Sequence, residues 1–500
     1  MNENLKGRIR NKELWKKVVS PEVAAKVIQN GMAIGTHGAT FCGYPKATFK
    51  ALAERIKRGE AIKVQIWSAS LVGEDADGVL ASCGGISKRI GSHADTTLRA
   101  QINNRQVLCN DVRAEMLPQY VQRGIFGNLD VAVIDAVAID ENGNIIPSAS
   151  PADACFLVQA AKKVIVEIDH SQPLGLEGFH DIFPLPSPPG APAIPLRRSY
   201  ERIGTPYIPA GFDRIDYIVE SQIPQKLPSK RDPDEEGMMI ARNLMQFFRK
   251  EVAAGRLGKN LLPLEPGLGN VADAVLKQLG ESEFEDLEIF TAVIGDSALN
   301  LADRGKLKAA NGCACFFSFE GWERFCNNLA RYRDRIIFRP LEITNSPELV
   351  YRLGVIGLNG VVEMDIYGHI NSSHIMGNRL LAGVGGAGVF ASNGSISIFL
   401  TPSSSAKGKV STIVPMVSHV DVTEHNVDVV VTEQGYADLR GLAPHERAME
   451  MIEKCSHPDY RPLLLEYYRK AEKEAGGHEP HLLGEAFSFH EKFKKTGSMK

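Results

Sequence analysis

Two glycine-rich turns hold the residues from which a chemistry can first be argued. The first places Gly267 and Gly269 between an apolar run and a helical pattern, in the order Gly-x-Gly-x-x-Ala. The second, Gly383 to Gly388, fits Gly-x-Gly-x-x-Gly, and we expect Asn-Gly and another strand after it instead of a helix. Glycine lets backbone N–H groups approach a ligand oxygen closely. Both turns are therefore candidates for an anion site or oxyanion hole, although tight turns without a ligand use the same residues.

The first turn also permits a dinucleotide-binding interpretation. Its glycines match one form of the Rossmann fingerprint, and Asp286 or Glu288 follows about twenty positions later, where a ribose partner would lie. The turn lies in the middle of the chain, however, and the second glycine turn has the wrong context. An NAD-dependent dehydrogenase is therefore kept only as an alternative, for which nicotinamide binding is the test.

Charged groups near the ends of other predicted strands are weaker candidates. Glu433 closes an apolar run, where a carboxylate can face a ligand or pair with a helix N-terminus. The segment 401–412 mixes hydroxyl groups with Lys407 and is suited to a phosphate, but solvated loops have the same composition.

The segment "SHVDVTEH" offers His419, Asp421 and His425. Their spacing fits no familiar set of metal ligands, and local hydrogen bonding explains them as well. We therefore expect no metal site.

Short apolar runs alternate with helical stretches and must position these groups. In the first half the runs are 61–69, 129–139, 162–168 and 214–221; in the second half they are 260–264, 287–294, 335–343, 360–368, 395–400, 411–417 and 427–435. Such near-continuous apolar strands are typical of parallel sheets covered on both faces. We predict two α/β domains, 1–225 and 226–500, with a helix from about Gly237, an irregular proline-rich segment at 183–209 and helices after about Pro444.

The composition excludes several classes of protein. The 500 residues are 44% hydrophobic and carry a formal net charge of −3, which argues against nucleic-acid binding because that needs a cationic excess. The charged N-terminus has no apolar segment of a secretory signal, and the uncharged run 380–406 holds too many glycines for a membrane span. The eight cysteines lack zinc or redox spacing. We expect a cytoplasmic protein with reduced thiols and no membrane partner.

Five ordered segments resemble the acetyl-CoA hydrolase/transferase family, and within it the class I CoA-transferases of the succinyl-CoA:acetate type. They are "LPLEPGLGNVADAVL" (262–276), "NGVVEMDIYGHINSS" (359–373), "AGVGGAGVF" (382–390), "KGKVSTIVPMVSHVD" (407–421) and "TEHNVDVVVTEQGYADLRGLAPHERA" (423–448), with "GYPKATFKALAER" (43–55) near the N-terminus. The resemblance implies two related CoA-transferase-fold domains with the active site between them, in a homodimer. It also implies acyl-CoA and short carboxylic acids as substrates, in acetate metabolism, and no permanently bound cofactor.

The resemblance further implies a role for individual residues. A glutamate attacks the acyl-CoA thioester, forms an acyl anhydride and becomes a glutamyl-CoA thioester that a second carboxylic acid resolves. Leu268 N–H and Gly386 N–H would form the oxyanion hole, Asn345 would orient the reacting group, and Glu433 would lie beside the CoA thiol arm. The residues expected to contact CoA are Gly267, Gly269, Gly385, Gly388 and Lys407.

The chain departs from the family at the nucleophile. The family strand reads Thr-Glu-Val-x-x-Asp, whereas this chain has Thr291-Ala292-Val293-Ile294-Gly295-Asp296, so that Ala292 occupies the glutamate position. A methyl group cannot attack a thioester, and covalent transfer is therefore closed. Three interpretations stay open: an introduced Glu-to-Ala replacement in a CoA-transferase, a natural non-catalytic acyl-CoA-binding protein, and an acetyl-CoA hydrolase that uses water in the vacated space.

Overall fold

The computed structural model describes residues 3–38, 42–186 and 188–500. The chain forms two compact units. The first contains Met1–Lys230, Phe290–Ala302 and Lys308–Leu349, and the second contains Arg231–Ile289, Asp303–Leu307 and Val350–Lys500. The division of the sequence into two domains near residue 225 remains our proposal. After that residue, segments of the two compact units alternate along the chain.

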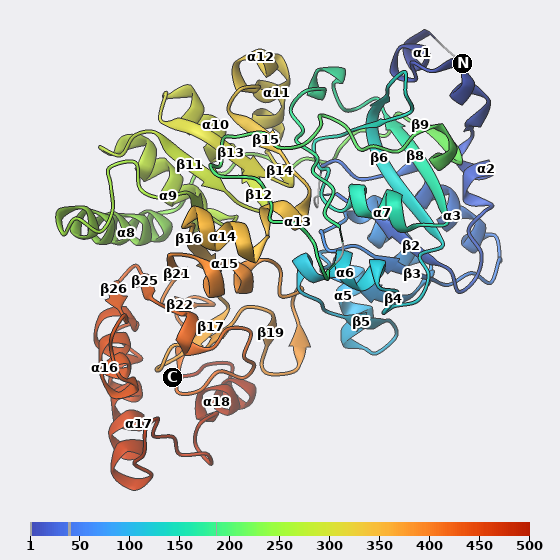
Figure 1. Ribbon diagram of the computed structural model, residues 1–500. Helices are drawn as coiled ribbons and strands as arrows, with labels where there is room; N and C mark the ends of the chain where they lie inside the picture. The colour runs from blue at the N-terminus through green and yellow to red at the C-terminus, as the bar shows by residue number, and fades with distance from the viewer. Residues whose placement is uncertain (1–2, 39–41, 187) are drawn as a thin grey trace. The chain divides into compact units, whose positions relative to one another are not determined.

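A nine-stranded sheet forms the centre of the first unit. Its strands are β1 (Val18–Val19), β2 (Ala33–Thr36), β3 (Val64–Trp67), β4 (Ile86–Ile90), β5 (Leu108–Asn110), β6 (Val131–Ile139), β7 (Ile145–Pro147), β8 (Lys163–Asp169) and β9 (Tyr217–Ser221). They follow the order β1–β9–β8–β6–β2–β3–β4–β5, all parallel, while β7 pairs antiparallel with β6. Strands β6, β8 and β9 lie side by side in Figure 1.

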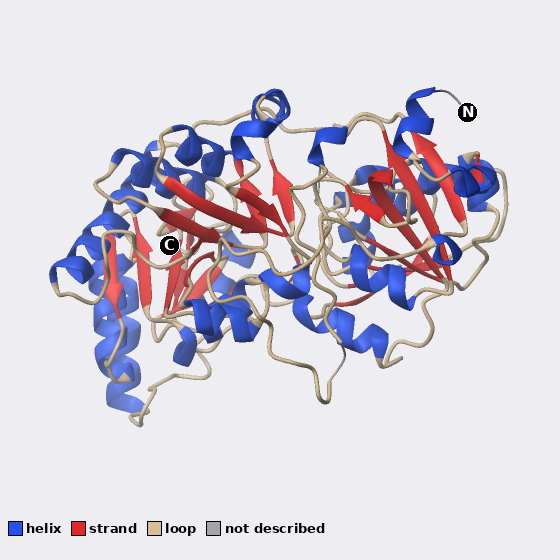
Figure 2. Ribbon diagram, turned by 45° about the horizontal axis from the view of Figure 1, so that its top comes forward, coloured by secondary structure: helices blue, strands red, loops and turns tan. Residues whose placement is uncertain are grey.

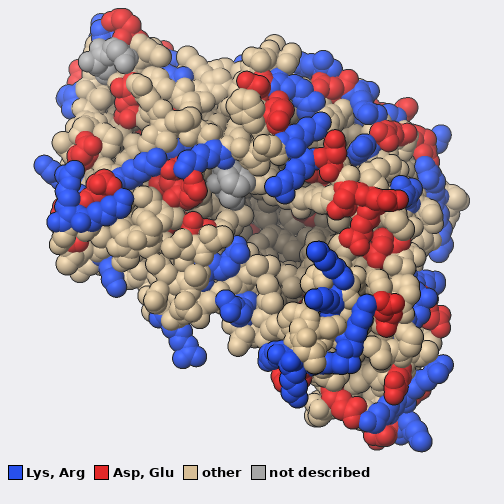
Figure 3. Space-filling view, turned by 180° about the vertical axis from the view of Figure 1, so that it is seen from behind, with Lys and Arg blue, Asp and Glu red and all other residues tan. Residues whose placement is uncertain are grey.

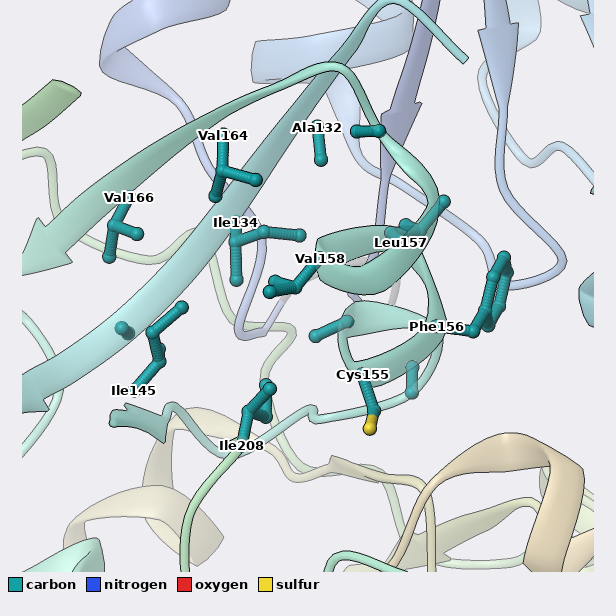
Figure 4. Packing of buried hydrophobic residues seen from close by; sticks show 14 of the residues in the cluster. Ala132, Ile134, Ile145, Cys155, Phe156, Leu157, Val158, Val164, Val166 and Ile208 are labelled. Carbon is teal, nitrogen blue, oxygen red and sulfur yellow. The ribbon is translucent and has the colours of Figure 1, made fainter. Parts of the chain in front are cut away.

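Both faces of this sheet are buried, which explains the near-continuous apolar strands. Val131 and Val133 of β6 pack in one buried cluster, and the alternate residues Ala132 and Ile134 pack in another. Because successive strand side chains point to opposite faces, the two clusters lie on opposite faces. Helices cover both faces (Figure 2), and Figure 4 shows Val158 among the side chains that pack near β6 and β8.

The helices of the first unit are short and follow the strands. Those before residue 230 are α1 (Glu3–Arg8), α2 (Pro21–Ala25), α3 (Ala47–Lys57), α4 (Val79–Ser82), α5 (Thr96–Asn103), α6 (Leu117–Gln122) and α7 (Ala154–Ala160). The later segments hold β12 (Val293–Gly295), β13 (Leu307–Gly312), β14 (Ala314–Phe316), β15 (Ile336–Phe338), α10 (Asp296–Asp303), α11 (Phe319–Asn327), α12 (Leu329–Tyr332), α13 (Leu341–Thr344) and α14 (Pro347–Leu353).

A buried carboxylate caps helix α3. Glu167 of β8 accepts hydrogen bonds from the backbone N–H groups of Lys46 (2.7 Å), Ala47 (2.7 Å) and Thr48 (3.1 Å), and from the Thr48 hydroxyl (3.1 Å). The first N–H groups of a helix have no partner within it, so an acceptor at this place is needed when the end is buried. Glu167 therefore joins α3 to the carboxyl end of β8.

The second unit also contains a mainly parallel sheet. Its strands are β10 (Leu264–Glu265), β11 (Leu287–Phe290), β16 (Ile356–Gly360), β21 (Ile396–Leu400), β25 (Val429–Thr432) and β26 (Gly435–Asp438). They follow the order β11–β10–β16–β21–β25–β26, and only β26 is antiparallel to its neighbour. The first five strands therefore end at one common edge.

The remaining elements of the second unit are helices and short paired strands. The helices are α8 (Glu235–Ala253), α9 (Asn270–Glu281), α15 (Ala387–Asn393), α16 (Pro444–Cys455), α17 (Arg461–Glu474) and α18 (Ser488–Thr496). The short strands are β17 (Glu363–Asp365), β18 (Ile370–Asn371), β19 (His374–Ile375), β20 (Arg379–Leu380), β22 (Ser404–Ser405), β23 (Val410–Ser411) and β24 (Ile413–Val414).

Three predicted elements differ in the structure. The run 287–294 is two strands, because β11 ends at Phe290 and β12 pairs separately with β14. The run 335–343 ends as helix α13, since Pro340 cannot donate to a sheet and precedes the first helical residue. The prediction that no helix follows the second glycine turn was wrong, because α15 begins at Ala387. This helix is short and has four small residues, so its sequence shows no helical pattern of apolar residues.

Several other predictions are confirmed. Helix α8 begins at Glu235, and residues after Pro444 are mostly helical. Within 183–209 the described residues form no helix and no strand, although Thr205 and Ile208 make single β-bridges to Ile182 and Ile145. No helix in the described part of the chain has both the length and the apolarity to span a membrane. On the face in Figure 3, basic and acidic side chains are interspersed, in agreement with the small net charge.

Replacing Glu167 by Gln tests the α3 cap. The amide keeps one acceptor oxygen but loses the charge, so we expect the first unit to lose about 1.5–3 kcal/mol of stability. The three tryptophans, Trp15, Trp67 and Trp322, all belong to the first unit. Urea denaturation followed by tryptophan fluorescence therefore reports on this unit.

Glu54→Gln on the same helix is the matched control, because Glu54 pairs with Lys57 at the surface. Its denaturation midpoint should stay close to that of the parent, since exposed pairs contribute little. Equal midpoints for the two variants would contradict a stabilising cap.

Candidate functional site

The first glycine turn needs glycine at both positions. Residues 266–269 connect β10 to α9, with φ of 64° at Gly267 and 104° at Gly269. A Cβ at Gly267 would also lie 3.1 Å from the Leu358 carbonyl oxygen. Between them Leu268 is 46% exposed, and among the described residues none accepts a hydrogen bond from its N–H. The turn therefore presents a free backbone donor to a ligand.

A buried carboxyl group supports this turn. Glu265, the last residue of β10, accepts a hydrogen bond from Gly267 N–H at 3.1 Å. Burial raises the pKa of Glu265 to about 7, although hydrogen bonds from the Gly267 and Leu358 backbone oppose that rise. Glu265 was not among the residues predicted for the site. Its position in the sequence, directly between an apolar run and the glycines, could have indicated it.

The second glycine turn ends in helix α15. Gly385 has φ of 63°, Gly386 is the N-cap residue, and Gly388 lies within the helix. A Cβ at Gly385 or Gly388 would meet open space. Among the described residues none accepts a hydrogen bond from Gly386 N–H, so this turn also offers a donor.

The first glycine turn and helix α15, which follows the second turn, both adjoin strand β16. Gly267 approaches the Leu358 carbonyl oxygen, and Phe390 of α15 packs against Gly357. The side chain of Asn359 on this strand is buried, and its Nδ2 has no acceptor in the described part of the chain. Asn359 is therefore a further candidate donor, although it was noted in the sequence only as part of a motif.

Glu433 lies in the turn between β25 and β26 and caps no helix. Its carboxylate accepts hydrogen bonds from the backbone N–H of Ser403 (2.8 Å) and from the Ser403 hydroxyl. Ser403 follows β21, so Glu433 links the carboxyl ends of two neighbouring parallel strands. Glu433 thus lies at a strand end, as the first interpretation places it, and its role toward a ligand stays a prediction.

Lys407 is exposed at the tip of the β22–β23 hairpin. Ala406, Lys407 and Gly408 all have positive φ, at 50°, 57° and 77°. Tyr460 donates a hydrogen bond from its hydroxyl to the Gly408 carbonyl at 3.0 Å, which holds this hairpin. No contact joins Lys407 to the glycine turns among the described residues, so its assignment to CoA stays a prediction.

Ala292 belongs to the first unit and follows β11 by two residues. Its carbonyl accepts a hydrogen bond from Cys313 N–H at 2.8 Å, while Thr291 N–H donates to Asn311 at 3.0 Å. Ala292 is half-buried and Thr291 is buried. The backbone at Ala292 is therefore held in place, and its side chain is partly open to solvent. Helix α10 begins four residues later, at Asp296.

Asn345 lies close to this segment within the first unit. It is buried at the end of α13, and its side-chain oxygen accepts a hydrogen bond from the Thr344 hydroxyl at 2.9 Å. Asn345 N–H donates to the Leu341 carbonyl at 2.8 Å, and Leu341 N–H donates to Ala152 at 3.0 Å. Ala152 N–H in turn donates to the carbonyl of Cys313 at 3.1 Å. Backbone hydrogen bonds through three intermediate residues thus connect the two sequence-predicted residues, Ala292 and Asn345.

A second buried acid, which no sequence pattern indicated, lies in this group. Glu342 of α13 is buried, and burial, followed by the charge of Asp153, raises its pKa to about 8. Its Oε2 has no hydrogen-bond donor in the described part of the chain. Glu342 is therefore largely protonated at pH 7 and can donate a hydrogen bond.

The dinucleotide interpretation does not fit the strand directions. Asp286 precedes β11 and Glu288 is its second residue, whereas the Gly267 turn follows β10. Because β10 and β11 are parallel, the acidic residues lie toward the opposite edge from the turn.

Comparison with known proteins identifies the family. The acetyl-CoA hydrolase/transferase N-terminal domain matches residues 1–224, and the C-terminal domain of the same family matches residues 321–468. The succinyl-CoA:acetate CoA-transferase of Clostridium kluyveri is 44% identical over 99% of this chain and 92% of its own length. The acetyl-CoA hydrolase of Schizosaccharomyces pombe is 40% identical over 99% of this chain and 98% of its own length.

A solved structure agrees in fold. The 4-hydroxybutyrate CoA-transferase of Porphyromonas gingivalis superposes with a TM-score of 0.63 at 22% identity, over 92% of this chain and 99% of that chain. Family members use coenzyme A thioesters as substrates. The chain therefore belongs to the acetyl-CoA hydrolase/transferase family and is an enzyme of this type.

Proposed function

We propose that the chain is an acyl-CoA:carboxylate CoA-transferase of the succinyl-CoA:acetate type, in which Ala292 closes the covalent route. The observation that carries the proposal is the pair of backbone donors, Leu268 N–H on a turn that adjoins strand β16 and Gly386 N–H at the start of α15, which packs on the same strand. The 44% identity to a succinyl-CoA:acetate CoA-transferase supports the choice of substrates.

The proposed reaction needs a carboxylate at position 292. Its oxygen attacks the thioester carbonyl, the C–S bond breaks, and an acyl anhydride and CoA thiolate form. The thiolate attacks the enzyme carbonyl, which gives a glutamyl-CoA thioester and the free carboxylate product. The acceptor carboxylate reverses both steps and leaves as the new acyl-CoA. Each attack makes a tetrahedral oxyanion, which backbone N–H groups stabilise without reorganising.

The other residues act in binding and orientation. Leu268 and Gly386 donate to the oxyanion, and Asn345 orients the reacting carbonyl. Glu433, held by Ser403, lies beside the CoA thiol arm. The remaining glycines and Lys407 contact pantetheine and its phosphates, because Gly385 and Gly388 leave open space for a ligand.

Slow hydrolysis of the thioester is a second candidate. It is favoured by the half-exposed Ala292, whose methyl group leaves space for a water molecule. Water would attack the thioester carbonyl, and the CoA thiolate would leave with the released proton. The name of the Schizosaccharomyces pombe relative, acetyl-CoA hydrolase, supports this alternative.

The family resemblance also supports a cytoplasmic homodimer without a permanent cofactor. Light scattering on the purified chain tests the dimer, and a monomer at all concentrations would contradict it.

Ala292→Glu tests the transferase directly. We expect exchange of CoA between succinyl-CoA and acetate to rise by at least about 10³-fold, because the variant supplies the missing nucleophile. Mass spectrometry should detect a CoA-bearing enzyme that borohydride traps. The half-buried position of Ala292 leaves the longer side chain room to reach solvent.

Ala292→Gln is the matched control, since it has the same size and no carboxylate. It should stay at the activity of the parent chain. A stable Ala292→Glu protein with no adduct and no exchange with acetate, propionate or butyrate would reject transfer through this position. If both chains bind acyl-CoA but neither reacts, a non-catalytic binding protein is the better description.

Glu265→Gln tests the support of the first glycine turn through pH. The pKa of Glu265 rises on folding from 4.5 to about 7, so between these values the folded chain holds a proton that the unfolded chain lacks. Protonation of Glu265 therefore stabilises the folded chain fully below about pH 4.5, and this stabilisation is lost as the pH rises through about 7. The total loss in the free energy of unfolding is at most about 3 kcal/mol. Glu265→Gln should lack this loss.

Calorimetry at about pH 5.5 and about pH 8.5 measures the effect, because the second unit contains none of the three tryptophans. The variant should gain stability relative to the parent at the higher pH. Glu281→Gln on α9 controls for the loss of one surface charge. Parallel pH profiles for the parent and Glu265→Gln would argue against a buried acid that titrates near 7.

A further inference from the structure

Two loops that are distant in sequence meet beside the β19–β20 hairpin. Asp421 N–H donates to the Ile370 carbonyl at 2.8 Å, and Ile370 N–H donates to Val422 at 2.8 Å. This bridge joins β18, which leads into the loop 372–373, to Asp421 and Val422. The bridge therefore places His374 next to His419, which lies 45 positions later in the chain.

Two imidazoles and a carboxylate converge at this meeting point. One ligand atom from each of His374, His419 and Asp421 lies within 4.8 Å of the others. The imidazole centroids are 3.8 Å apart, and His419 Nε2 lies 3.1 Å from Asp421 Oδ1. We propose that His374, His419 and Asp421 bind one divalent transition-metal ion, with zinc as the probe.

The separations suit a single ion. Two ligand atoms bound to tetrahedral zinc lie roughly 3.3 Å apart, close to the separation of His419 Nε2 and Asp421 Oδ1. Side-chain rotations that shorten the widest distance between two of the ligand atoms by at most about 1.5 Å bring all three atoms to this spacing. Two histidines and one carboxylate are a common donor set for such ions, and a water molecule fills the fourth position.

Hydrogen bonds with neighbouring groups orient the three side chains before an ion binds, as the residues around the ligands do in known metal sites. Asp421 Oδ2 accepts hydrogen bonds from the N–H groups of Ser372 (2.7 Å) and Ser373 (2.9 Å), and the Ser373 hydroxyl donates to the same carboxylate at 2.8 Å. The oxygen of that hydroxyl lies 2.8 Å from His374 Nδ1. If Nδ1–H donates to it, His374 Nε2 is left as the metal ligand.

A second carboxylate fixes the residues that flank the ligands. Glu363 Oε1 accepts hydrogen bonds from Asn371 Nδ2 (2.9 Å) and from the N–H of Ser418 (2.8 Å). Asn371 in turn accepts from His374 N–H at 2.9 Å. Both loops are thus anchored, while the side chain of His419 is 38% exposed and leaves a path for an ion.

The proposed role is structural. Leu381 N–H donates to the Ser373 carbonyl at 2.7 Å, one residue before Ala382 and the second glycine turn. An ion on His374 therefore ties down the base of the hairpin that leads into this turn. The proposal concerns metal binding and stands whether or not the chain transfers CoA.

Equilibrium dialysis of the full chain tests the site. After treatment with a chelator, the parent should take up about one zinc ion per chain and gain thermal stability, because the ion binds the folded state. His374→Gln and His419→Gln should each lower the affinity at least about 10-fold. Cobalt in place of zinc should show visible absorption in the parent that both variants lose.

His425→Gln is the matched control, since the side chain of His425 is 80% exposed and lies outside the group. It should bind zinc as the parent does. Circular dichroism confirms that the variants are folded, and the histidine variants are used because Asp421 also holds the loop. Absence of zinc uptake by the parent, or equal uptake by the parent and a folded His374→Gln/His419→Gln double variant, would overturn the proposal.

Discussion

Parallel pairing of β10, β16, β21 and β25 is the constraint on which the candidate site of the second unit depends. Parallel strands end at one common edge, so the groups that follow them are brought together whatever their distance in sequence. The Gly267 turn follows β10, Ser403 follows β21 and Glu433 follows β25. Helix α15 leads back to β21, and its N-terminal Gly386 therefore lies toward the same edge.

Each unit contains a buried carboxyl group next to candidate residues. Glu265, which accepts from Gly267 N–H, and Glu342, on the helix that ends at Asn345, have pKa values raised by burial to about 7 and about 8. Desolvation favours the neutral form of an acid, so each can hold a proton at neutral pH. A protonated carboxyl group can donate a hydrogen bond, which an ionised one cannot.

Ala292 lies on a backbone that is well anchored within the first unit. Its carbonyl accepts from Cys313 N–H, and backbone hydrogen bonds through Ala152 and Leu341 continue from Cys313 to Asn345. In the second unit the glycine turns have positive φ values at Gly267, Gly269 and Gly385. Each of these backbone segments is thus fixed by contacts within its own unit.

The sequence by itself determined the α/β class, four of the nine strands in the first half (β3, β6, β8 and β9), helix α8 and the family, because long apolar runs and family motifs are local patterns. It also identified both glycine turns and Glu433. It did not reveal Glu265, Glu342, Asn359 or His374, whose surroundings come from distant segments. Helix α15 and the break after β11 were missed as well, since small residues in one and continuous apolar residues in the other give no local signal. Only tertiary structure decided these points, because burial, strand pairing and the meeting of His374 with His419 depend on contacts far apart in the chain.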